Sequence, residues 1–146
     1  MNRQGHCAVM ECKDQTIWVM FVQDAVYPPE KLDEMVSQCD YVVMATPLTP
    51  QTEKLMSASA IDSMKATAVF VNIGRGKCVD EPALIAALRE RRIRGAALDV
   101  FFTEPLPADN ELWGLDNVLI SPHTADRTKV RSWGEPLKFV GLSLCH

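Results

Sequence analysis

Three ionisable residues, Arg75, Glu104 and His123, carry the side-chain types that anion binding and proton transfer require. A guanidinium binds anions through charge-assisted hydrogen bonds. An imidazole titrates near neutral pH and can give or take a proton, and a carboxylate beside it can orient it. Taken singly, each residue has a structural interpretation: a histidine after a strand can cap a turn, Gly-Arg-Gly is typical of a turn, and Glu-Pro is typical of a loop. Their joint placement therefore decides the prediction.

Each of the three residues follows an apolar run that is typical of a buried strand. Four such runs cover residues 41–46, 68–73, 96–100 and 118–121. Continuous rather than alternating apolar runs indicate strands covered on both faces, and hence a parallel sheet. Ligands of open parallel sheets bind beyond the carboxyl ends of the strands. Because Arg75, Glu104 and His123 follow three of these ends, the pattern predicts that they share one edge of the sheet.

Helical segments alternate with these runs, which predicts an α/β fold of right-handed βαβ units with helices on both faces. The clearest helix covers residues 81–92, with Asp80 as N-cap, Pro82 in the first turn and Gly95 as C-terminal cap. Its predicted buried stripe is Leu84, Ile85 and Leu88.

Two shorter helices are predicted upstream. Residues 29–38 place Leu32, Met35 and Val36 on one face. Ser59 and Asp62 have the spacing of a capping box at the start of a second helix.

Composition narrows the functional classes. The 146 residues are 47% hydrophobic and carry a net charge of −4, which predicts one globular domain without a nucleic-acid or membrane partner. Five cysteines at irregular spacing support neither a disulfide framework nor a zinc site, so we expect a cytoplasmic protein and interpret Cys78 as a packing residue. The apolar run at 17–22 is too short to span a bilayer and is interpreted as a buried strand. Organellar targeting stays open, because Met1 need not be the native start.

Three motifs carry a resemblance to a known family. They are Asn72-Ile-Gly-Arg-Gly76 with Val79-Asp-Glu81, Ala97-Leu-Asp-Val-Phe101 with Glu104-Pro105, and Ser121-Pro-His-Thr124. In order and spacing, about residues 24–125 resemble the D-isomer-specific 2-hydroxyacid dehydrogenases. Within that family, the glyoxylate and hydroxypyruvate reductases look nearest.

The resemblance implies a Rossmann-type parallel sheet, NAD or NADP as cofactor, a small 2-oxo or 2-hydroxy acid as substrate, and a homodimer for full-length members. It implies that His123 donates a proton to the substrate carbonyl, that Glu104 pairs with His123, and that Arg75 binds the substrate carboxylate. It further places Pro47, Thr52 and Ile73 along the cofactor, and makes Asp99 an acceptor for the nicotinamide carboxamide. For Asp99 the alternative is a cap on the following turn.

The phosphate-binding signature of such folds is missing from the 146 residues. No Gly-x-Gly-x-x-Gly occurs, so the amino-terminal βαβ unit is incomplete. The acidic residue expected at the end of the second strand is also not identified, so the choice between NAD and NADP stays open. We divide the chain into an irregular segment at 1–22, a partial dinucleotide-binding domain at 23–128 and a divergent tail at 129–146. This organisation predicts a fragment, a truncated gene product or a degenerate paralogue with impaired activity alone.

Three functions are compatible with these features. The leading one is an NAD(P)-dependent oxidoreductase of 2-hydroxy acids, whose particular substrate stays open. The second is a dinucleotide-sensing interaction protein resembling the corepressors that share this fold. The third is a non-functional remnant.

Overall fold

The computed structural model describes residues 8–10 and 25–125, which form two parallel sheets. The larger sheet has four strands in the order of the sequence: β3 (Tyr41–Met44), β4 (Val69–Asn72), β5 (Gly95–Leu98) and β6 (Val118–Ile120). Every neighbouring pair is parallel. The four predicted strands and the predicted α/β class are therefore confirmed.

A second, two-stranded sheet pairs β1 (Ala8–Met10) with β2 (Ala25–Tyr27) in parallel. β1 falls in the segment that was predicted to be irregular, and neither strand was predicted. Each of these two strands has only three residues. The strand predicted at 17–22 lies outside the described residues.

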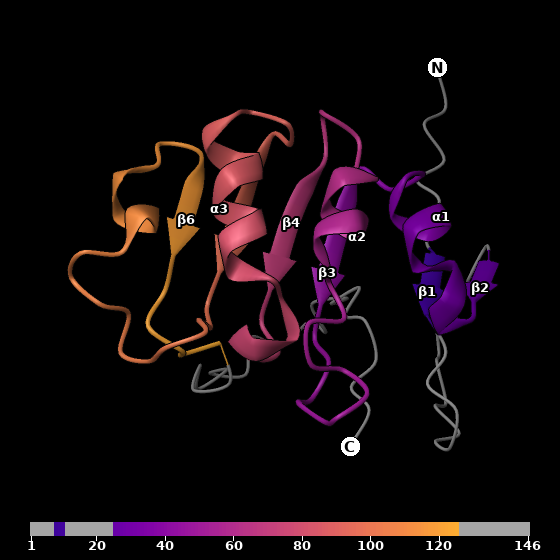
Figure 1. Ribbon diagram of the computed structural model, residues 1–146, viewed down its shortest axis with the longest axis horizontal. Helices are drawn as coiled ribbons and strands as arrows, with labels where there is room; N and C mark the ends of the chain where they lie inside the picture. The colour runs from indigo at the N-terminus through magenta and orange to yellow at the C-terminus, as the bar shows by residue number, and fades with distance from the viewer. Residues whose placement is uncertain (1–7, 11–24, 126–146) are drawn as a thin grey trace, which may run out of the picture.

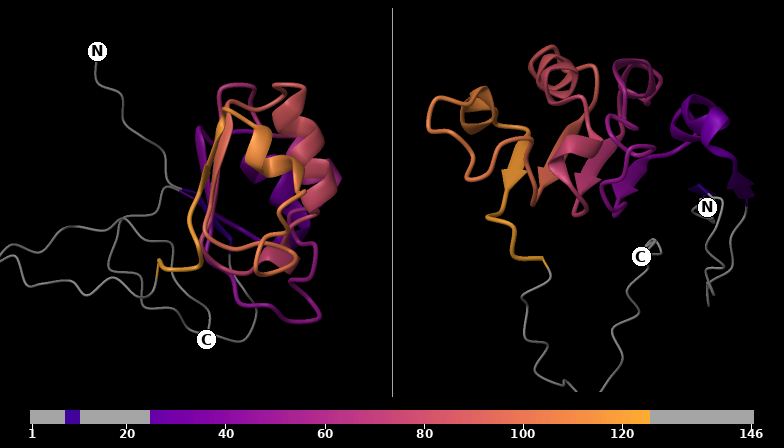
Figure 2. Two further views of the ribbon diagram at one scale, coloured as in Figure 1. Left: turned by 90° about the vertical axis from the view of Figure 1, so that its left-hand side faces the viewer. Right: turned by 60° about the horizontal axis from the view of Figure 1, so that its bottom comes forward.

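Among the described residues, three α-helices alternate with the strands and all lie on one side of the sheets (Figure 2). They are α1 (Leu32–Val36), which continues the 3-10 helix η1 (Pro29–Lys31), α2 (Ala58–Asp62) and α3 (Glu81–Arg89). Two further 3-10 helices are η2 (Gly76–Cys78) and η3 (Glu111–Gly114). The predicted layer on the opposite face has no counterpart among residues 25–125. The strand order β3-β4-β5-β6 explains this, because right-handed crossovers that progress in one direction all pass over the same face.

The core lies between the helices and the covered sheet face. Its largest fully buried side chains include Met56, Ile61, Phe70, Leu84 and Leu88. The predicted apolar face of the first helix is also buried, with Leu32, Met35 and Val36 each at most 9% exposed. Each such aliphatic or aromatic side chain contributes roughly 1.5–3 kcal/mol when it leaves water.

Helix α3 begins where the sequence predicts, at residue 81, but it ends at residue 89 instead of the predicted 92. The Asp80 side chain accepts a hydrogen bond from the Ala83 amide at 3.3 Å, as an N-cap does. The helix ends at Arg89, and Arg91 takes the left-handed conformation with φ of 57°. The prediction that Gly95 caps this helix is wrong, because Gly95 is the first residue of β5. A methyl group there would lie 2.6 Å from the Asn117 carbonyl oxygen, so close packing between strand and loop requires this glycine.

The capping box predicted at Ser59 is also wrong. Ser57 is the N-cap of α2, and its hydroxyl accepts from the Ala60 amide at 3.3 Å. The Ser59 hydroxyl instead donates to the Asp33 carboxylate at 2.6 Å and links α2 to α1. Ser57 therefore caps the helix, and Ser59 makes the tertiary contact.

Candidate active site

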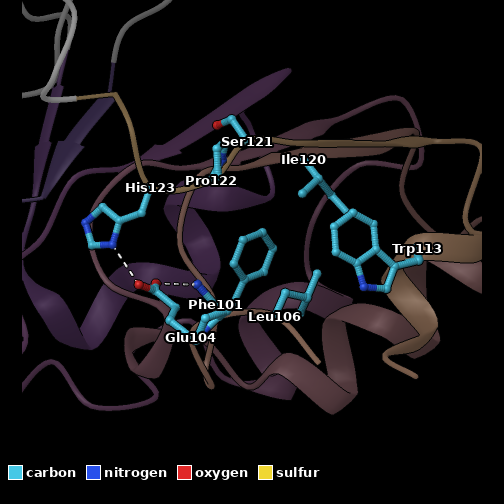
Figure 3. Close-up of a pocket in the computed structure, with 9 residues that line it drawn as sticks. Phe101, Glu104, Leu106, Trp113, Ile120, Ser121, Pro122 and His123 are labelled. Carbon is cyan, nitrogen blue, oxygen red and sulfur yellow. Dashed lines mark hydrogen bonds and ion pairs between the residues drawn. The ribbon is translucent and has the colours of Figure 1, made fainter. Parts of the chain in front are cut away.

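The carboxyl ends of β4, β5 and β6 point to the same edge of the sheet (Figure 1). The segments that follow these ends carry Arg75, Glu104 and His123. Among them, Glu104 and His123 are in direct contact: the Glu104 Oε2 atom lies 2.7 Å from Nδ1 of His123 (Figure 3). This is hydrogen-bond distance, so the contact expected from the sequence is present.

The second oxygen of Glu104 is held by its own loop. Oε1 accepts a hydrogen bond from the Phe101 amide at 3.0 Å. Burial raises the pKa of Glu104, but the Phe101 amide and the charges of His123 and Arg75 outweigh burial and hold this pKa below its ordinary value. Glu104 is therefore an ionised acceptor at neutral pH, and its two oxygens join the loop to the imidazole.

Arg75 is presented between two glycines that the packing requires. A methyl group at Gly74 would lie 2.6 Å from the Thr46 carbonyl oxygen, and one at Gly76 would lie 1.9 Å from the Phe101 carbonyl carbon and oxygen. The Gly-Arg-Gly turn is thus wedged between the segments that follow β3 and β5. The Arg75 side chain is exposed, and its charge contributes to the lowered pKa of Glu104.

Asn72 supports this turn, although it was not predicted as a site residue. Its side chain is 1% exposed, its Oδ1 accepts from the Gly74 amide at 3.0 Å, and its Nδ2 donates to the Arg75 carbonyl at 3.3 Å. The signal was the position of Asn72 at the start of the Gly-Arg-Gly motif, where a short amide side chain can bond to its own turn.

Asp99 holds the turn that carries His123. Its carboxylate accepts from the Ser121 hydroxyl, from the Thr124 amide at 3.0 Å and from the Ala125 amide at 2.9 Å. His123 lies inside this turn with a φ of 52°, a conformation that few non-glycine residues adopt. Burial raises the pKa of Asp99, and these three donors reverse the effect and lower it overall. The turn-cap interpretation therefore accounts for the contacts seen, and the carboxamide contact stays a prediction.

The comparison with known proteins decides the family. The family model described as "D-isomer specific 2-hydroxyacid dehydrogenase, NAD binding domain" matches residues 10–125. The chain belongs to this family. The match begins at residue 10, upstream of the expected residue 24.

Similar members of the family have reductase names. The chain is 43% identical over 103 residues to a glyoxylate/hydroxypyruvate reductase B of Enterobacter agglomerans, covering 70% of this chain and 32% of that protein. It is 47% identical over 97 residues to a glyoxylate reductase of Thermococcus onnurineus, covering 66% and 29%. A crystal structure of a D-isomer specific 2-hydroxyacid dehydrogenase from Xanthobacter autotrophicus Py2 matches with a TM-score of 0.72 and 39% identity, covering 80% and 38%. The chain thus spans about a third of the length of these relatives.

Three of the predicted cofactor residues lie in the segments that follow β3 and β4. Ile73 follows β4 with 44% of its surface exposed, and Pro47 is half-buried in the segment after β3. Thr52 differs, because it is 4% exposed and its hydroxyl is used inside its own loop. That hydroxyl donates to the Pro47 carbonyl at 2.6 Å and accepts from the Thr49 amide at 2.7 Å. Ile73 thus presents exposed apolar surface, whereas the Thr52 hydroxyl is used within its own loop.

Cys78 lies behind this edge and is fully buried, and burial raises the pKa of its thiol. It therefore packs in the core, as interpreted from the sequence. Within the described ranges, no three His, Cys, Asp or Glu side chains are grouped so as to hold a metal ion. No helix among those same residues has the length and apolar character to cross a bilayer.

A cavity of about 670 Å³ opens beside the Glu104–His123 pair. In Figure 3 the pair lies at one end, the Trp113 ring at the other and Phe101 between them. The Trp113 indole donates to the Pro107 carbonyl at 2.9 Å, which fixes the far wall. The polar end of this largely apolar cavity is therefore the predicted acid–base pair.

Proposed function

We propose that this chain carries the acid–base and carboxylate-binding residues of an NAD(P)-dependent reductase of small 2-oxo acids such as glyoxylate or hydroxypyruvate. The observation that carries the proposal is the hydrogen bond between Glu104 Oε2 and His123 Nδ1 at 2.7 Å. A carboxylate at Nδ1 fixes the ring and leaves Nε2 directed away from it, as a general acid requires. Among the described residues, Nε2 has no hydrogen-bond partner.

In this proposal each residue has one task. Arg75 binds the substrate carboxylate and orients the adjacent carbonyl group. His123 donates a proton from Nε2 to the carbonyl oxygen, and Glu104 stays ionised and stabilises the imidazolium before transfer. The bound nicotinamide supplies the hydride, which is the cofactor's own chemistry. In the oxidative direction His123 takes the proton back.

Cofactor contacts in the proposal rest on the sheet edge. Ile73 and Pro47 would line the ring, and Asp99 would hold the His123 turn whether or not it also reaches the carboxamide. Neither NAD nor NADP is favoured by the residues described. The chain covers only 32% of the Enterobacter reductase and 29% of the Thermococcus one. The substrate of the complete protein and its assembly as a homodimer are therefore also proposed rather than shown.

The alternatives from the sequence are less well supported. The relatives reported above are named as reductases, which does not favour a dinucleotide-sensing corepressor. A remnant free of selection would not need to retain Asn72, both glycines and Asp99 in hydrogen-bonded or close-packed positions around the three ionisable residues.

The decisive experiment is a chimera. Residues 41–125 replace the matching segment of the Enterobacter reductase, and reduction of glyoxylate and hydroxypyruvate is followed by loss of NADH or NADPH absorbance. We expect turnover, and we expect His123→Gln in the chimera to lower kcat by about 10²–10⁴-fold with cofactor affinity unchanged. A folded chimera that binds cofactor and reduces neither acid contradicts the proposal.

A further inference from the structure

Glu81, the first residue of α3, contacts the loop that carries Glu104 at two points. Its Oε2 accepts from the Phe102 amide at 2.8 Å, and its Oε1 accepts from the Asn110 side-chain amide at 3.3 Å. Asn110 in turn caps η3, with its Oδ1 accepting from the Leu112 amide at 2.9 Å. One carboxylate therefore ties both ends of the loop to the start of a helix.

Two consecutive amides of this loop bind two different carboxylates. The Phe101 amide donates to Glu104 at 3.0 Å, and the Phe102 amide donates to Glu81 at 2.8 Å. The two amides belong to adjacent planar peptide groups, so only the φ and ψ torsions of Phe101 separate them. Fixing the Phe102 amide therefore restricts the direction of the Phe101 amide, and with it the position of Glu104.

The same short stretch packs against the segment that follows Arg75. Gly76 approaches so closely that a methyl group there would lie 2.5 Å from the Phe102 nitrogen. The Lys77 ammonium lies 5.8 Å from the centre of the Phe102 ring, a cation–π distance. The stretch from Gly76 to Glu81 thus runs beside Phe101 and Phe102 and joins the Arg75 turn to the Glu104 loop.

We propose that Glu81 is a positioning residue for the Glu104–His123 pair, acting by holding the Phe101–Phe102 backbone against the segment that follows Arg75. The inference rests on the proposed function for its catalytic meaning and on the contacts above for its geometry. A merely structural role for Glu81 would be a favourable charge in the first turn of α3. That role would affect the amides of α3 and leave the Glu104 loop unchanged.

The test uses the 146-residue chain and needs no turnover. NMR hydrogen exchange is measured at the Phe101 amide and at the Leu84 amide of α3, and the Glu104 carboxyl carbon is titrated. Variants are Glu81→Ala, Glu81→Gln and the matched control Glu30→Ala, which removes an exposed carboxylate outside this loop. His123 and Arg75, the charged groups that face Glu104, remain in every variant.

We expect Glu81→Ala to speed exchange at Phe101 by roughly tenfold or more relative to Leu84. It should also raise the pKa of Glu104, because an ordered amide no longer favours the ionised form. Loss of the Glu81 charge alone would move this pKa downward, so the sign separates positioning from electrostatics. Glu81→Gln, which keeps an acceptor for Phe102, should preserve Phe101 protection.

Equal exchange at Phe101 in Glu81→Ala and Glu30→Ala would overturn the inference, as would acceleration confined to α3. If Glu81→Ala does not fold, Glu81→Asp decides, because it keeps the charge and shortens the reach by one methylene group. If the Phe101 amide loses protection in Glu81→Asp and keeps it in Glu81→Gln, the positioning role is supported. If the Phe101 amide is equally protected in both variants, the positioning role is overturned. A chimera without turnover in which these effects persist would refute the proposed function and leave the positioning role intact.

Discussion

Glu104 and His123 meet at 2.7 Å although they lie 19 positions apart in the sequence, and the Phe101 amide donates to the other Glu104 oxygen at 3.0 Å. The carboxylate thus bridges the loop after β5 and the turn after β6. Such bridging orients the imidazole without a further side chain.

The folded chain should lose stability in acid through Glu104 and Asp99. Both pKa values are lowered on folding, so both carboxylates contribute stability above their unfolded pKa values that is lost as pH falls through the folded values. We expect the free energy of unfolding in urea to decrease as the pH drops below about 4.5, which is the ordinary pKa of a glutamate such as Glu104. Glu104→Gln should flatten this dependence. An identical slope in the variant would show that Glu104 gains no stabilisation from its partners.

Gly76→Ala should destabilise the chain strongly, because the added methyl group would lie 1.9 Å from the Phe101 carbonyl carbon and oxygen. Overpacking against backbone costs about 1–3 kcal/mol or more, and urea unfolding measures it. Gly114→Ala is the matched control, since nothing lies within 4 Å of its added methyl group. We expect the control to change stability by no more than about 0.5 kcal/mol. Equal effects at both glycines would refute the close approach of the Arg75 turn to the Glu104 loop.

Asp99→Asn should disrupt the His123 turn. The Asp99 carboxylate accepts hydrogen bonds from three donors. In the variant the Asn NH2 group is itself a donor, so at least one of the three donors would lose its acceptor. We expect a loss of about 1–3 kcal/mol in the free energy of unfolding, together with faster exchange of the Thr124 and Ala125 amides. Asp109→Asn, on an exposed loop, is the control. If the Thr124 and Ala125 amides stay protected in Asp99→Asn, the turn does not depend on the carboxylate.

Dinucleotide binding by the 146-residue chain alone should be weak. Pyrophosphate sites in this fold use backbone amides at a helix amino terminus that a glycine-rich loop brings close, and the sequence has no Gly-x-Gly-x-x-Gly. Calorimetric titration with NADH and NADPH should give little heat and no stoichiometric break, and neither glyoxylate nor hydroxypyruvate should be reduced at ordinary enzyme rates of roughly 1–1,000 per second. Stoichiometric binding with such turnover would show that other residues replace the missing loop.

The sequence alone predicted strands at 41–46, 68–73, 96–100 and 118–121, and the structure has strands at 41–44, 69–72, 95–98 and 118–120. It also predicted the N-cap Asp80 and the shared edge of the three ionisable residues. These features depend on continuous apolar runs, on local capping chemistry and on the rule that ligands meet the carboxyl ends of parallel strands. They are encoded within short stretches, so one sequence is enough to find them.

Only the tertiary structure decided which partner each polar group takes. Ser57 rather than Ser59 caps α2, Gly95 serves a strand rather than a helix end, and Asp99 binds the His123 turn. The helices of residues 25–125 lie on one side of the sheet because of the order of the strands, and no local sequence pattern predicts that order. Several donors compete for each acceptor within hydrogen-bond reach, and packing between distant segments selects among them. Spacing along the chain carries no information about that selection, because residues such as Glu81 and Phe102 lie 21 positions apart, with α3 and β5 between them, and meet only in the packed fold.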